Sequence, residues 1–278
     1  MRLALAQIRS TEDPDYNLRR ALESMERARD EGADAVAFAE VVLNRFFPCR
    51  RGDASAAALA QTIPGPITDA VAAQAKKLGL VTIFNLYERD GDRYFDSSPV
   101  FDADGSLLGV TRMIHITDYP GFHEQDYYHP GDRGARVYQT AAGRVGVAIC
   151  YDRHYPEYMR ALGVAGAEWV AIPQAGTVGE WPEGLYEAEV QTAAFQNGYF
   201  AALVNRVGDE GELCFAGESF AVDPDGGFLG RAKSGEEDLL VVDLDLTRCS
   251  KSNARQLFWR HRRPELYGEW LGLGDPEE

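Results

Sequence analysis

Short apolar runs alternate with longer amphipathic segments along the whole chain. Apolar runs of about four to eight residues between turn residues are typical of buried strands, whereas apolar positions three and four residues apart indicate one face of a helix. The Asp104-Gly105 pair can turn a hairpin. In the first half the pattern predicts strands at 3–8, 35–38 and 80–87, a hairpin of 94–101 and 106–116, and helices at 17–29 and 68–78.

The second half repeats this rhythm. The pattern predicts strands at 145–150, 169–173, 200–205 and 238–243, a hairpin of 215–222 and 227–232, and helices at 155–164 and 182–196. The segment that follows, 252–271, is rich in arginine and aromatic residues and is predicted to be partly helical. Each half therefore begins as β-α-β and later contributes hairpins.

This alternation indicates an α/β fold. No long linker or low-complexity stretch divides the 278 residues, so we expect a single domain over 1–278 with a C-terminal tail from about residue 252. Sheets that carry helices on one face bury the other face against a further layer. The expected architecture is therefore a four-layer α-β-β-α sandwich, with two mixed sheets face to face and helices outside.

Charge and cysteine content narrow the possible partners. The formal net charge of −16 predicts repulsion from phosphate backbones, so nucleic acid is not expected as a partner. No apolar run is long enough to span a bilayer, and the N-terminus resembles a first strand more than a signal peptide. The cysteines form no C-x-x-C pair, and we expect free thiols in a cytoplasmic protein. They are Cys49, Cys150, Cys214 and Cys249.

One of these cysteines has a setting that suits chemistry. Cys150 closes the apolar run 145–149 and is followed by a predicted helix. Open α/β sheets bind ligands at the carboxyl ends of their strands, and the start of a helix favours a thiolate or an oxyanion. The alternative is a buried structural cysteine.

Glu40 has an equivalent position after the apolar run 35–39. A carboxylate is costly to bury unless it is paired or used, and a partly buried glutamate can accept a proton from a thiol. The alternative is a solvated glutamate at the start of a loop.

Glu124 lies in a turn-rich loop with His115, His123 and His129 nearby. The spacing does not match H-E-x-x-H, and no paired cysteines accompany it, so we expect no metal. The chain also lacks a P-loop and a Gly-x-Gly-x-x-Gly segment, so a nucleotide cofactor has no support.

Several segments, taken in order, resemble the nitrilase superfamily of carbon-nitrogen hydrolases. In that family a glutamate follows an early strand, a lysine lies in an R-K-x-H segment, and a cysteine closes a strand before x-D-x-x-x-P-E. The resemblance covers nearly the whole chain. The matching segments are Phe-Ala-Glu40, Asn44-Arg-Phe-Phe-Pro, Arg112-Met-Ile-His115, Pro-Gly-Phe-His-Glu124, Pro130-Gly-Asp132, Gly-Val-Ala-Ile-Cys150-Tyr-Asp-Arg-His-Tyr-Pro-Glu, Asn205-Arg-Val-Gly208 and Arg262-Arg-Pro-Glu-Leu-Tyr267.

The resemblance implies a role for each matching residue. Cys150 would attack an amide-type carbonyl to form an acyl-enzyme, and Glu40 would act as general base for the thiol and then for water. The backbone N–H of Tyr151 would form half of an oxyanion hole. Glu124 would position the reacting groups. No cofactor is implied.

One position departs from the family pattern, because the lysine falls on Met113. Loss of its charge would leave Glu40 and Glu124 together without a counter-ion, so one of them should hold a proton. Three explanations stay open at this point. The chain is a catalytically silent relative that still binds, or Arg112 supplies the charge although it should face the other way, or the methionine is an engineered substitution.

Arg153 gives a further indication of the substrate. In relatives that cleave N-carbamoyl amino acids an arginine at this position holds the substrate carboxylate, which suits a guanidinium fork. The resemblance to that branch, which includes β-ureidopropionase, implies a small N-carbamoyl or amide substrate. A surface ion pair is the alternative for Arg153. Relatives also pair into dimers or larger homo-oligomers through helices near the nucleophile and through the tail, although the tail could instead pack on its own domain.

Overall fold

The computed structural model describes residues 1–271. Its first sheet has the strand order β15-β1-β2-β3-β5-β4, with β6 paired to the opposite edge of β5 from β3 and β4. Strands β1, β2 and β3 are parallel, and the others pair antiparallel. The strands are β1 (Arg2–Gln7), β2 (Ala35–Phe38), β3 (Val81–Ile83), β4 (Leu86–Asp90), β5 (Arg93–Phe101), β6 (Leu107–Arg112) and β15 (Asp238–Asp243).

The second sheet has the order β14-β13-β10-β9-β8-β7, with a parallel centre of β8, β9 and β10. A separate two-stranded ribbon joins β11 and β12. These strands are β7 (Val137–Thr140), β8 (Gly143–Val147), β9 (Trp169–Gln174), β10 (Phe200–Asn205), β11 (Val207–Asp209), β12 (Cys214–Ala216), β13 (Phe220–Val222) and β14 (Phe228–Arg231).

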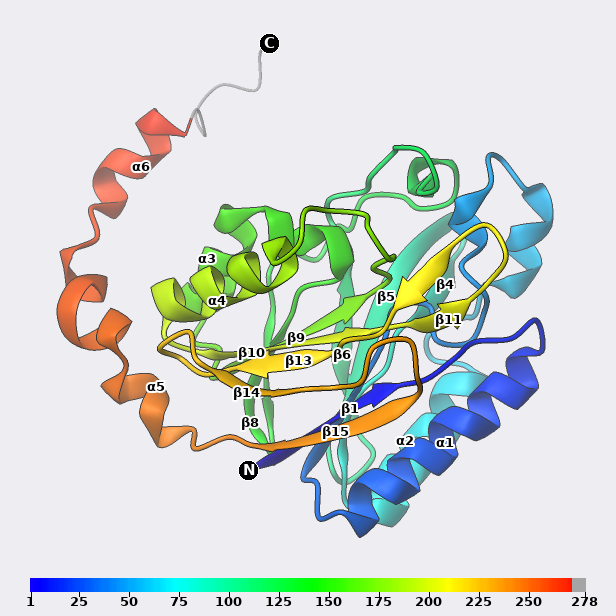
Figure 1. The fold of residues 1–278 in the computed structure, drawn as a ribbon, viewed down its shortest axis with the longest axis horizontal. Helices are drawn as coiled ribbons and strands as arrows, with labels where there is room; N and C mark the ends of the chain where they lie inside the picture. Colours follow the sequence, from blue (N-terminus) through cyan, green and yellow to red (C-terminus); the bar gives the residue numbers. More distant parts are fainter. Residues whose placement is uncertain (272–278) are drawn as a thin grey trace.

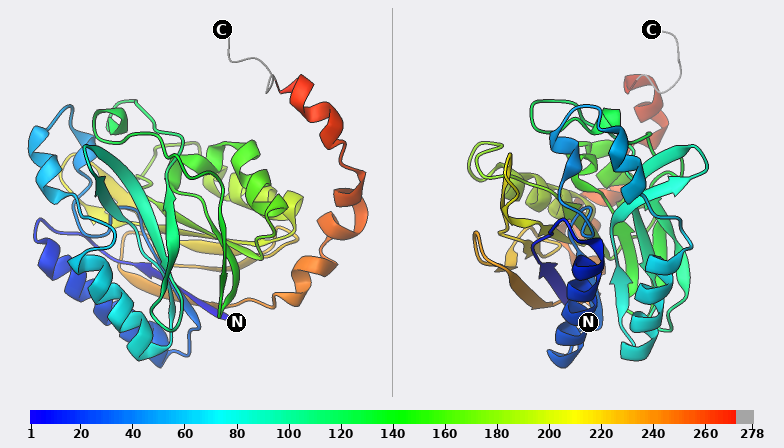
Figure 2. Two further views of the ribbon diagram at one scale, coloured as in Figure 1. Left: turned by 180° about the vertical axis from the view of Figure 1, so that it is seen from behind. Right: turned by 90° about the vertical axis from the view of Figure 1, so that its right-hand side faces the viewer.

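Alternating side chains assign each strand face to one layer. In β1, Leu3 and Leu5 pack between the two sheets, whereas Ala4 and Ala6 pack against helices α1 (Pro14–Asp30) and α2 (Pro66–Leu78). In the second sheet the outer face packs in the same way against α3 (Pro156–Val164) and α4 (Leu185–Asn197). The four layers of the expected α-β-β-α sandwich are therefore confirmed (Figures 1 and 2).

The C-terminal tail leaves the sandwich after α5 (Thr247–Lys251) and passes the α3–α4 layer (Figure 1). Arg255 donates to the carbonyl of Gly163 at the end of α3, and Phe258 packs on Phe195 of α4. Beyond this anchor, α6 (Pro264–Trp270) extends away from the sandwich (Figure 2). No helix of residues 1–271 is long and apolar enough to cross a bilayer.

Four predicted strands are wrong in their extent, and one of them, 106–116, ends as β6 at Arg112. The strand at 80–87 is split between β3 and β4, because the side chain of Asn85 turns inward to bond Asp96. The strand at 215–222 is broken by positive φ angles at Gly217 and Glu218, so its two halves join different sheets. The strand at 145–150 ends at Val147, and β7 was not predicted at all.

Candidate active site

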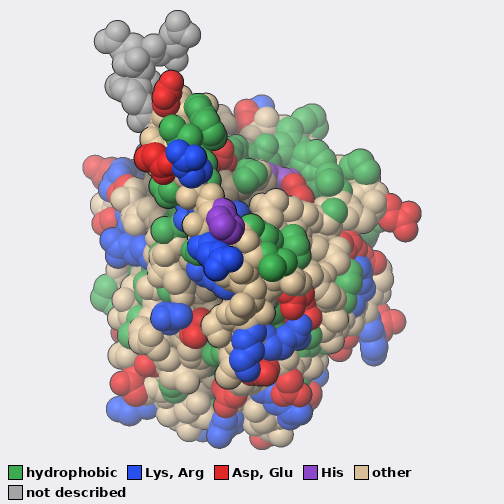
Figure 3. Space-filling model, turned by 90° about the vertical axis from the view of Figure 1, so that its left-hand side faces the viewer, with side chains coloured by type: hydrophobic (Ala, Val, Ile, Leu, Met, Phe, Trp, Pro, Cys, Tyr) green, Lys and Arg blue, Asp and Glu red, His purple; other side chains and the backbone are tan. Residues whose placement is uncertain are grey.

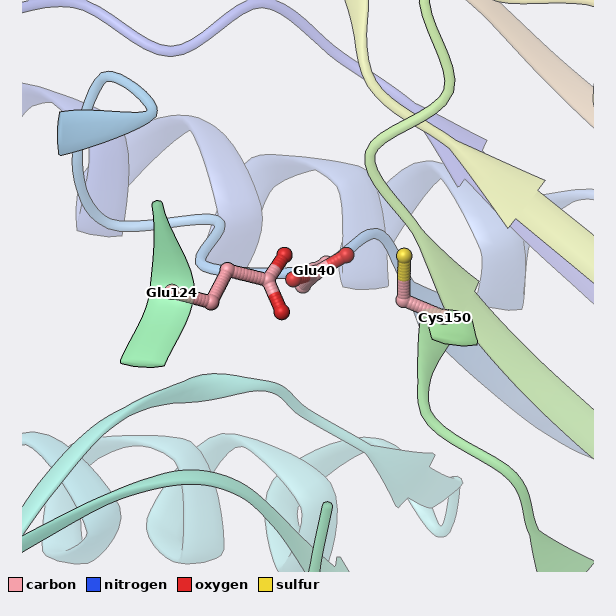
Figure 4. A group of neighbouring side chains, drawn as sticks. All are labelled: Glu40, Glu124 and Cys150. Carbon is pink, nitrogen blue, oxygen red and sulfur yellow. The ribbon is translucent and has the colours of Figure 1, made fainter. Parts of the chain in front are cut away.

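Three of the predicted site residues meet at the edge where β2 and β8 end. Glu40 follows β2, Cys150 follows β8, and Glu124 begins a short 3-10 turn, Glu124–Asp126. One carboxylate oxygen of each glutamate and the Cys150 sulfur all lie within 4.8 Å of one another. Figure 4 shows the three side chains pointing toward one another. Both glutamates are fully buried, and Cys150 is 5% exposed.

The backbone at Cys150 is held in an unusual conformation. Its φ of +42° lies in the left-handed region, where residues other than glycine are strained. Arg153 Nη1 donates to the Cys150 carbonyl at 2.9 Å and to Gln174 Oε1 at 2.7 Å. Gln174 Nε2 in turn donates to the Cys150 sulfur at 3.2 Å. Main chain and sulfur are thus fixed by one connected network.

The loop after β2 is held in a similar way. Val41 has a φ of +48°, which is exceptional for a β-branched residue. Arg206 Nη1 donates to the carbonyls of Glu40 and Val41 at 2.8 Å each, and Asn85 Oδ1 accepts from the Val41 N–H at 2.6 Å. These bonds fix the point from which the Glu40 side chain enters the site.

A third carboxyl group, that of Asp96 on β5, lies against Glu40. Asn85 Nδ2 donates to Asp96 Oδ1 at 2.6 Å, but Asp96 Oδ2 has no hydrogen-bond partner among residues 1–271. The carboxylate oxygens of Glu40 and Glu124 also lack one in this part of the chain. Two facing carboxyl groups can share a hydrogen bond only when one of them carries a proton.

Burial and mutual repulsion keep these groups protonated. Burial, and then the charge of Glu124, raises the pKa of Glu40 to about 8. Burial, and then the charge of Asp96, raises the pKa of Glu124 well above its usual range. The pKa of the Cys150 thiol is raised by burial and by the charges of Glu40 and Glu124. Each of these shifts favours the protonated form, the thiol of Cys150 and the neutral carboxyl groups of the two glutamates.

Met113, to which the family pattern assigns the lysine, is fully buried. Its neighbour Arg112 points away from the site, as alternation along a strand predicts. The Arg112 guanidinium bonds Glu88 at 2.6 Å, Asp90 at 2.7 Å and Asp132 at 3.0 Å. Arg112 is therefore engaged elsewhere, and the explanation in which it replaces the lysine charge is wrong.

The Arg153 side chain is buried and contacts the main chain of Cys150. Its Nε is 3.3 Å from Glu189 Oε2, its guanidinium stacks 4.4 Å from the centre of the Tyr186 ring, and its Nη2 has no hydrogen-bond partner within residues 1–271. The surface ion pair considered for Arg153 is therefore wrong. Tyr151 is the second residue of the turn Cys150–His154, so its N–H has no acceptor within that turn.

The three histidines near Glu124 do not come together. His115 Nδ1 pairs with Asp152 at 2.7 Å, His123 Nδ1 pairs with Asp118 at 3.0 Å, and His129 pairs with a backbone carbonyl. Within residues 1–271 the set with a spacing that would suit a metal ion is Glu40, Glu124 and Cys150. The same three groups are those proposed to react with a substrate.

Sequence reasoning missed four groups that support the site. Gln174 is the last residue of β9, a position similar to that of Glu40 after β2. The strand-end position of Gln174 was therefore a usable signal. Asp152 accepts from the backbone N–H of Ile114 and His115 and thereby ties the segment after Met113 to the turn of Cys150. Arg206 directly follows the predicted strand 200–205, so its position was a signal of the same kind, whereas Asp96 lies inside β5 and gave none.

A groove of about 490 Å³ lies next to Arg153, because Tyr186, on which the Arg153 guanidinium stacks, is part of its lining. Glu180, which lines the groove, accepts hydrogen bonds of 2.5 Å from the hydroxyls of Tyr119 and Tyr186. Burial, then the charge of Glu180 and to a lesser extent that of Cys150, raises the pKa of both tyrosines. The groove is thus lined by an acidic and aromatic network within electrostatic reach of the thiol.

Alkylation of Cys150 by iodoacetamide is expected to accelerate as the pH rises through about 8. Below that pH, Glu40 holds its own proton and cannot accept that of the thiol, and above it the carboxylate can. In Glu40→Gln the rise near pH 8 should disappear. Peptide mass mapping measures the rate, with exposed Cys214 as an internal reference. Fast, pH-independent labelling below pH 7 would indicate a thiolate paired with a cation and would contradict this description.

Comparison with known proteins identifies the family of the chain. The sequence profile of the carbon-nitrogen hydrolases matches residues 2–254. The chain is 32% identical to an N-carbamoylputrescine amidase of Solanum lycopersicum, over 98% of this chain and 95% of the relative. A citrullinase of Francisella tularensis is 29% identical, over 97% of each. A carbon-nitrogen hydrolase from Helicobacter pylori G27 superposes with a TM-score of 0.91 at 29% identity, over 98% of each chain. The protein belongs to the carbon-nitrogen hydrolase family, within the nitrilase superfamily.

Proposed function

We propose that the protein hydrolyses non-peptide C–N bonds of N-carbamoyl compounds or related amides through an acyl-Cys150 intermediate. The observation that carries the proposal is the convergence of a strained, tightly held thiol with two buried glutamates within 4.8 Å. That combination supplies a nucleophile and a proton acceptor in one place. The curated relatives named for carbamoyl substrates support the substrate class.

In the proposed reaction Glu40 accepts the thiol proton while the sulfur bonds the carbonyl carbon. Glu40 then returns that proton to the departing nitrogen, which leaves as ammonia. A water molecule, deprotonated by Glu40, attacks the resulting thioester and releases the thiol. From an N-carbamoyl compound the water step releases a carbamic acid, whose remaining C–N bond then breaks to give CO2 and the amine. The N–H of Tyr151 faces the developing oxyanion, and Glu124 orients the proton acceptor.

Arg153 is proposed to bind a carboxylate of the substrate through Nη2, the one nitrogen of its guanidinium that faces no acidic or carbonyl oxygen. Its other nitrogens already bind Cys150 and Gln174 or face Glu189. Arg153 would therefore offer one donor group rather than a full fork, which is a weaker anchor than a bidentate pair.

A catalytically silent binding protein is the second candidate. It is favoured by one observation, the fully buried Met113 where the family has a charged lysine. The support network around Cys150 and Glu40 argues against it, because a thiol that no longer reacts gains nothing from strained backbone at Cys150 and at Val41, the residue after Glu40.

Ammonia release distinguishes these two candidates. The panel contains N-carbamoyl-β-alanine, N-carbamoyl-D-amino acids, N-carbamoylputrescine and simple amides. We expect slow turnover of at least one compound by the natural chain and none above background by Cys150→Ala, which removes the nucleophile. Circular dichroism checks that the variant is folded. Equal rates for the two proteins, or no turnover by either, would refute the proposed reaction.

We also propose that the chain forms a homodimer or a larger homo-oligomer through α3, α4 and the tail. Leu257 and Trp270 of the tail are 62% and 66% exposed. Figure 3 shows hydrophobic and basic side chains together on this side of the molecule. Such exposed apolar and arginine-rich surface is typical of interface cores. The cytoplasmic location and the absence of a nucleic-acid partner stay predictions from the sequence.

A further inference from the structure

The charge balance of the site is its most unusual property. Glu40, Glu124, Asp96 and Cys150, here called the carboxyl cluster, are all buried. Among residues 1–271, no lysine or arginine nitrogen bonds any of their carboxylate oxygens, and Arg206 reaches Glu40 only through its backbone carbonyl. Buried acidic groups are normally paired with a cation or with several hydrogen-bond donors.

A second observation indicates a missing ligand. The hydroxyl of Tyr128 is buried and has no hydrogen-bond partner among residues 1–271. It lies close enough to the carboxyl cluster that its pKa is raised by burial and then by the charges of Asp96, Glu40 and Glu124. Unbonded carboxylate oxygens on two glutamates and an unbonded hydroxyl in one place suit an occupant that is rich in N–H donors.

We propose that the carboxyl cluster binds the planar cation of a guanidinium or amidinium compound, whose own charge replaces the one that Met113 lacks. This inference rests on the proposed thiol-dependent hydrolysis and names the substrate class for which this chain is suited. Neutral N-carbamoyl compounds would then be poor substrates, because they bring no charge into the site.

The geometry suits such a group. Two N–H···O bonds of about 2.9 Å that leave one nitrogen at about 120° span about 5 Å. One carboxylate oxygen of Glu40 and one of Glu124 lie within 4.8 Å of each other, which fits one terminal nitrogen bonded to both glutamates. The planar ion then leaves one face free for the Cys150 sulfur. A metal ion in the same place would use the sulfur as a ligand, which would consume the nucleophile.

The reaction of a guanidinium also removes the need for a lysine. Glu40, ionised when the cation binds, accepts the Cys150 proton, and the thiolate attacks the central carbon to give a neutral tetrahedral adduct. No oxyanion forms. Glu40 returns the proton to one nitrogen, the C–N bond breaks, and ammonia leaves a thiouronium cation paired with Glu124. Water then adds to that carbon and loses a proton to Glu40. The C–S bond breaks as the new hydroxyl gives its proton to the Cys150 sulfur, and Glu40 passes its proton to ammonia. Overall, a guanidinium and water give a urea and ammonium.

Calorimetric titration with two matched probes tests the binding step. Propylguanidine and propylurea have the same shape and differ in charge, and a Cys150→Ala background prevents turnover. We expect propylguanidine to bind about ten-fold or more tightly than propylurea, which corresponds to about 1.4 kcal/mol. Met113→Lys should reverse the preference, whereas the control Met113→Leu should keep it. Equal binding of the two probes to the Met113 protein would overturn the inference.

Two further measurements exclude other readings of the result. Glu124→Gln should weaken propylguanidine more than propylurea, and this variant serves as the test if Met113→Lys does not fold. Zn²⁺ and Mg²⁺ are titrated separately into the natural chain. Tight binding of either metal, with no preference for propylguanidine, would identify a metal site and refute the guanidinium proposal.

The natural chain should also convert propylguanidine to propylurea and ammonia faster than it releases ammonia from propylurea. Failure of the two proposals can be distinguished. If ammonia is released from N-carbamoyl compounds but propylguanidine does not bind preferentially, the guanidinium inference falls and the hydrolase proposal stands. If propylguanidine binds preferentially but no compound of either class reacts, the hydrolase proposal falls and the cation site stands.

Discussion

Met113→Lys is expected to raise the turnover of neutral N-carbamoyl compounds by about 10²–10³-fold, the typical effect of one oxyanion-stabilising group. The fully buried methionine cannot stabilise developing negative charge, whereas an ammonium group beside Glu40 and Glu124 can. The new cation would also favour ionised Glu40, which is otherwise held protonated up to a pH of about 8. Initial rates of ammonia release at pH 7, at saturating and limiting substrate, give kcat and kcat/KM.

Met113→Leu is the control for this experiment, because it keeps the volume and apolar character of the side chain. We expect its rates to stay close to those of the natural chain. A gain that also appears in Met113→Leu would have to come from packing. If Met113→Lys is folded and labels with iodoacetamide but gains no turnover on any carbamoyl compound, the lysine position is not what limits this site. The charge-deficit description of the carboxyl cluster would then be wrong.

The fold could be predicted from the sequence because its inner strands have a clear hydrophobic pattern. Parallel strands buried on both faces are continuous apolar runs, as 35–38 and 200–205 are. The failures have one physical cause. In 215–222 apolar residues flank Gly217-Glu218-Ser219 on both sides, and nothing in a hydrophobic pattern reveals that the backbone at Gly217 and Glu218 has positive φ. The split at Asn85 depends on its bond to Asp96, a contact that exists only in the folded chain.

The candidate site, like the fold, could be predicted only in part. Cys150 and Glu40 each follow an apolar strand, and the rule that strand ends carry functional groups selects them without further information. Glu124 lies in an irregular loop and was found only through the resemblance to a family. Asp96 was not found, because a polar residue inside the predicted hairpin strand 94–101 is expected to face solvent. Its burial beside Glu40 depends on how the strand that carries it pairs with its neighbours, and this pairing cannot be predicted from the sequence pattern.

Arg112 links the stability of the protein to the strand that carries Met113. Its side chain is 1% exposed and bonds Glu88, itself 2% exposed, through both Nε and Nη2. The same guanidinium stacks on the Phe95 ring at 3.8 Å. Ser97 adds one further hydrogen bond to Glu88. If the guanidinium is removed, Glu88 keeps a hydroxyl and the more distant Arg133, whose Nη2 is 3.9 Å away.

Arg112→Met is therefore expected to lower the free energy of unfolding by about 3–5 kcal/mol, because it leaves the Glu88 carboxylate buried without its partner. Urea unfolding followed by circular dichroism measures the change as a lower midpoint at an unchanged m-value. Arg112→Met combined with Glu88→Gln should recover a large part of the loss, since no unpaired charge is then left inside. A single variant that loses less than about 1 kcal/mol would instead place this pair among ion pairs that water screens.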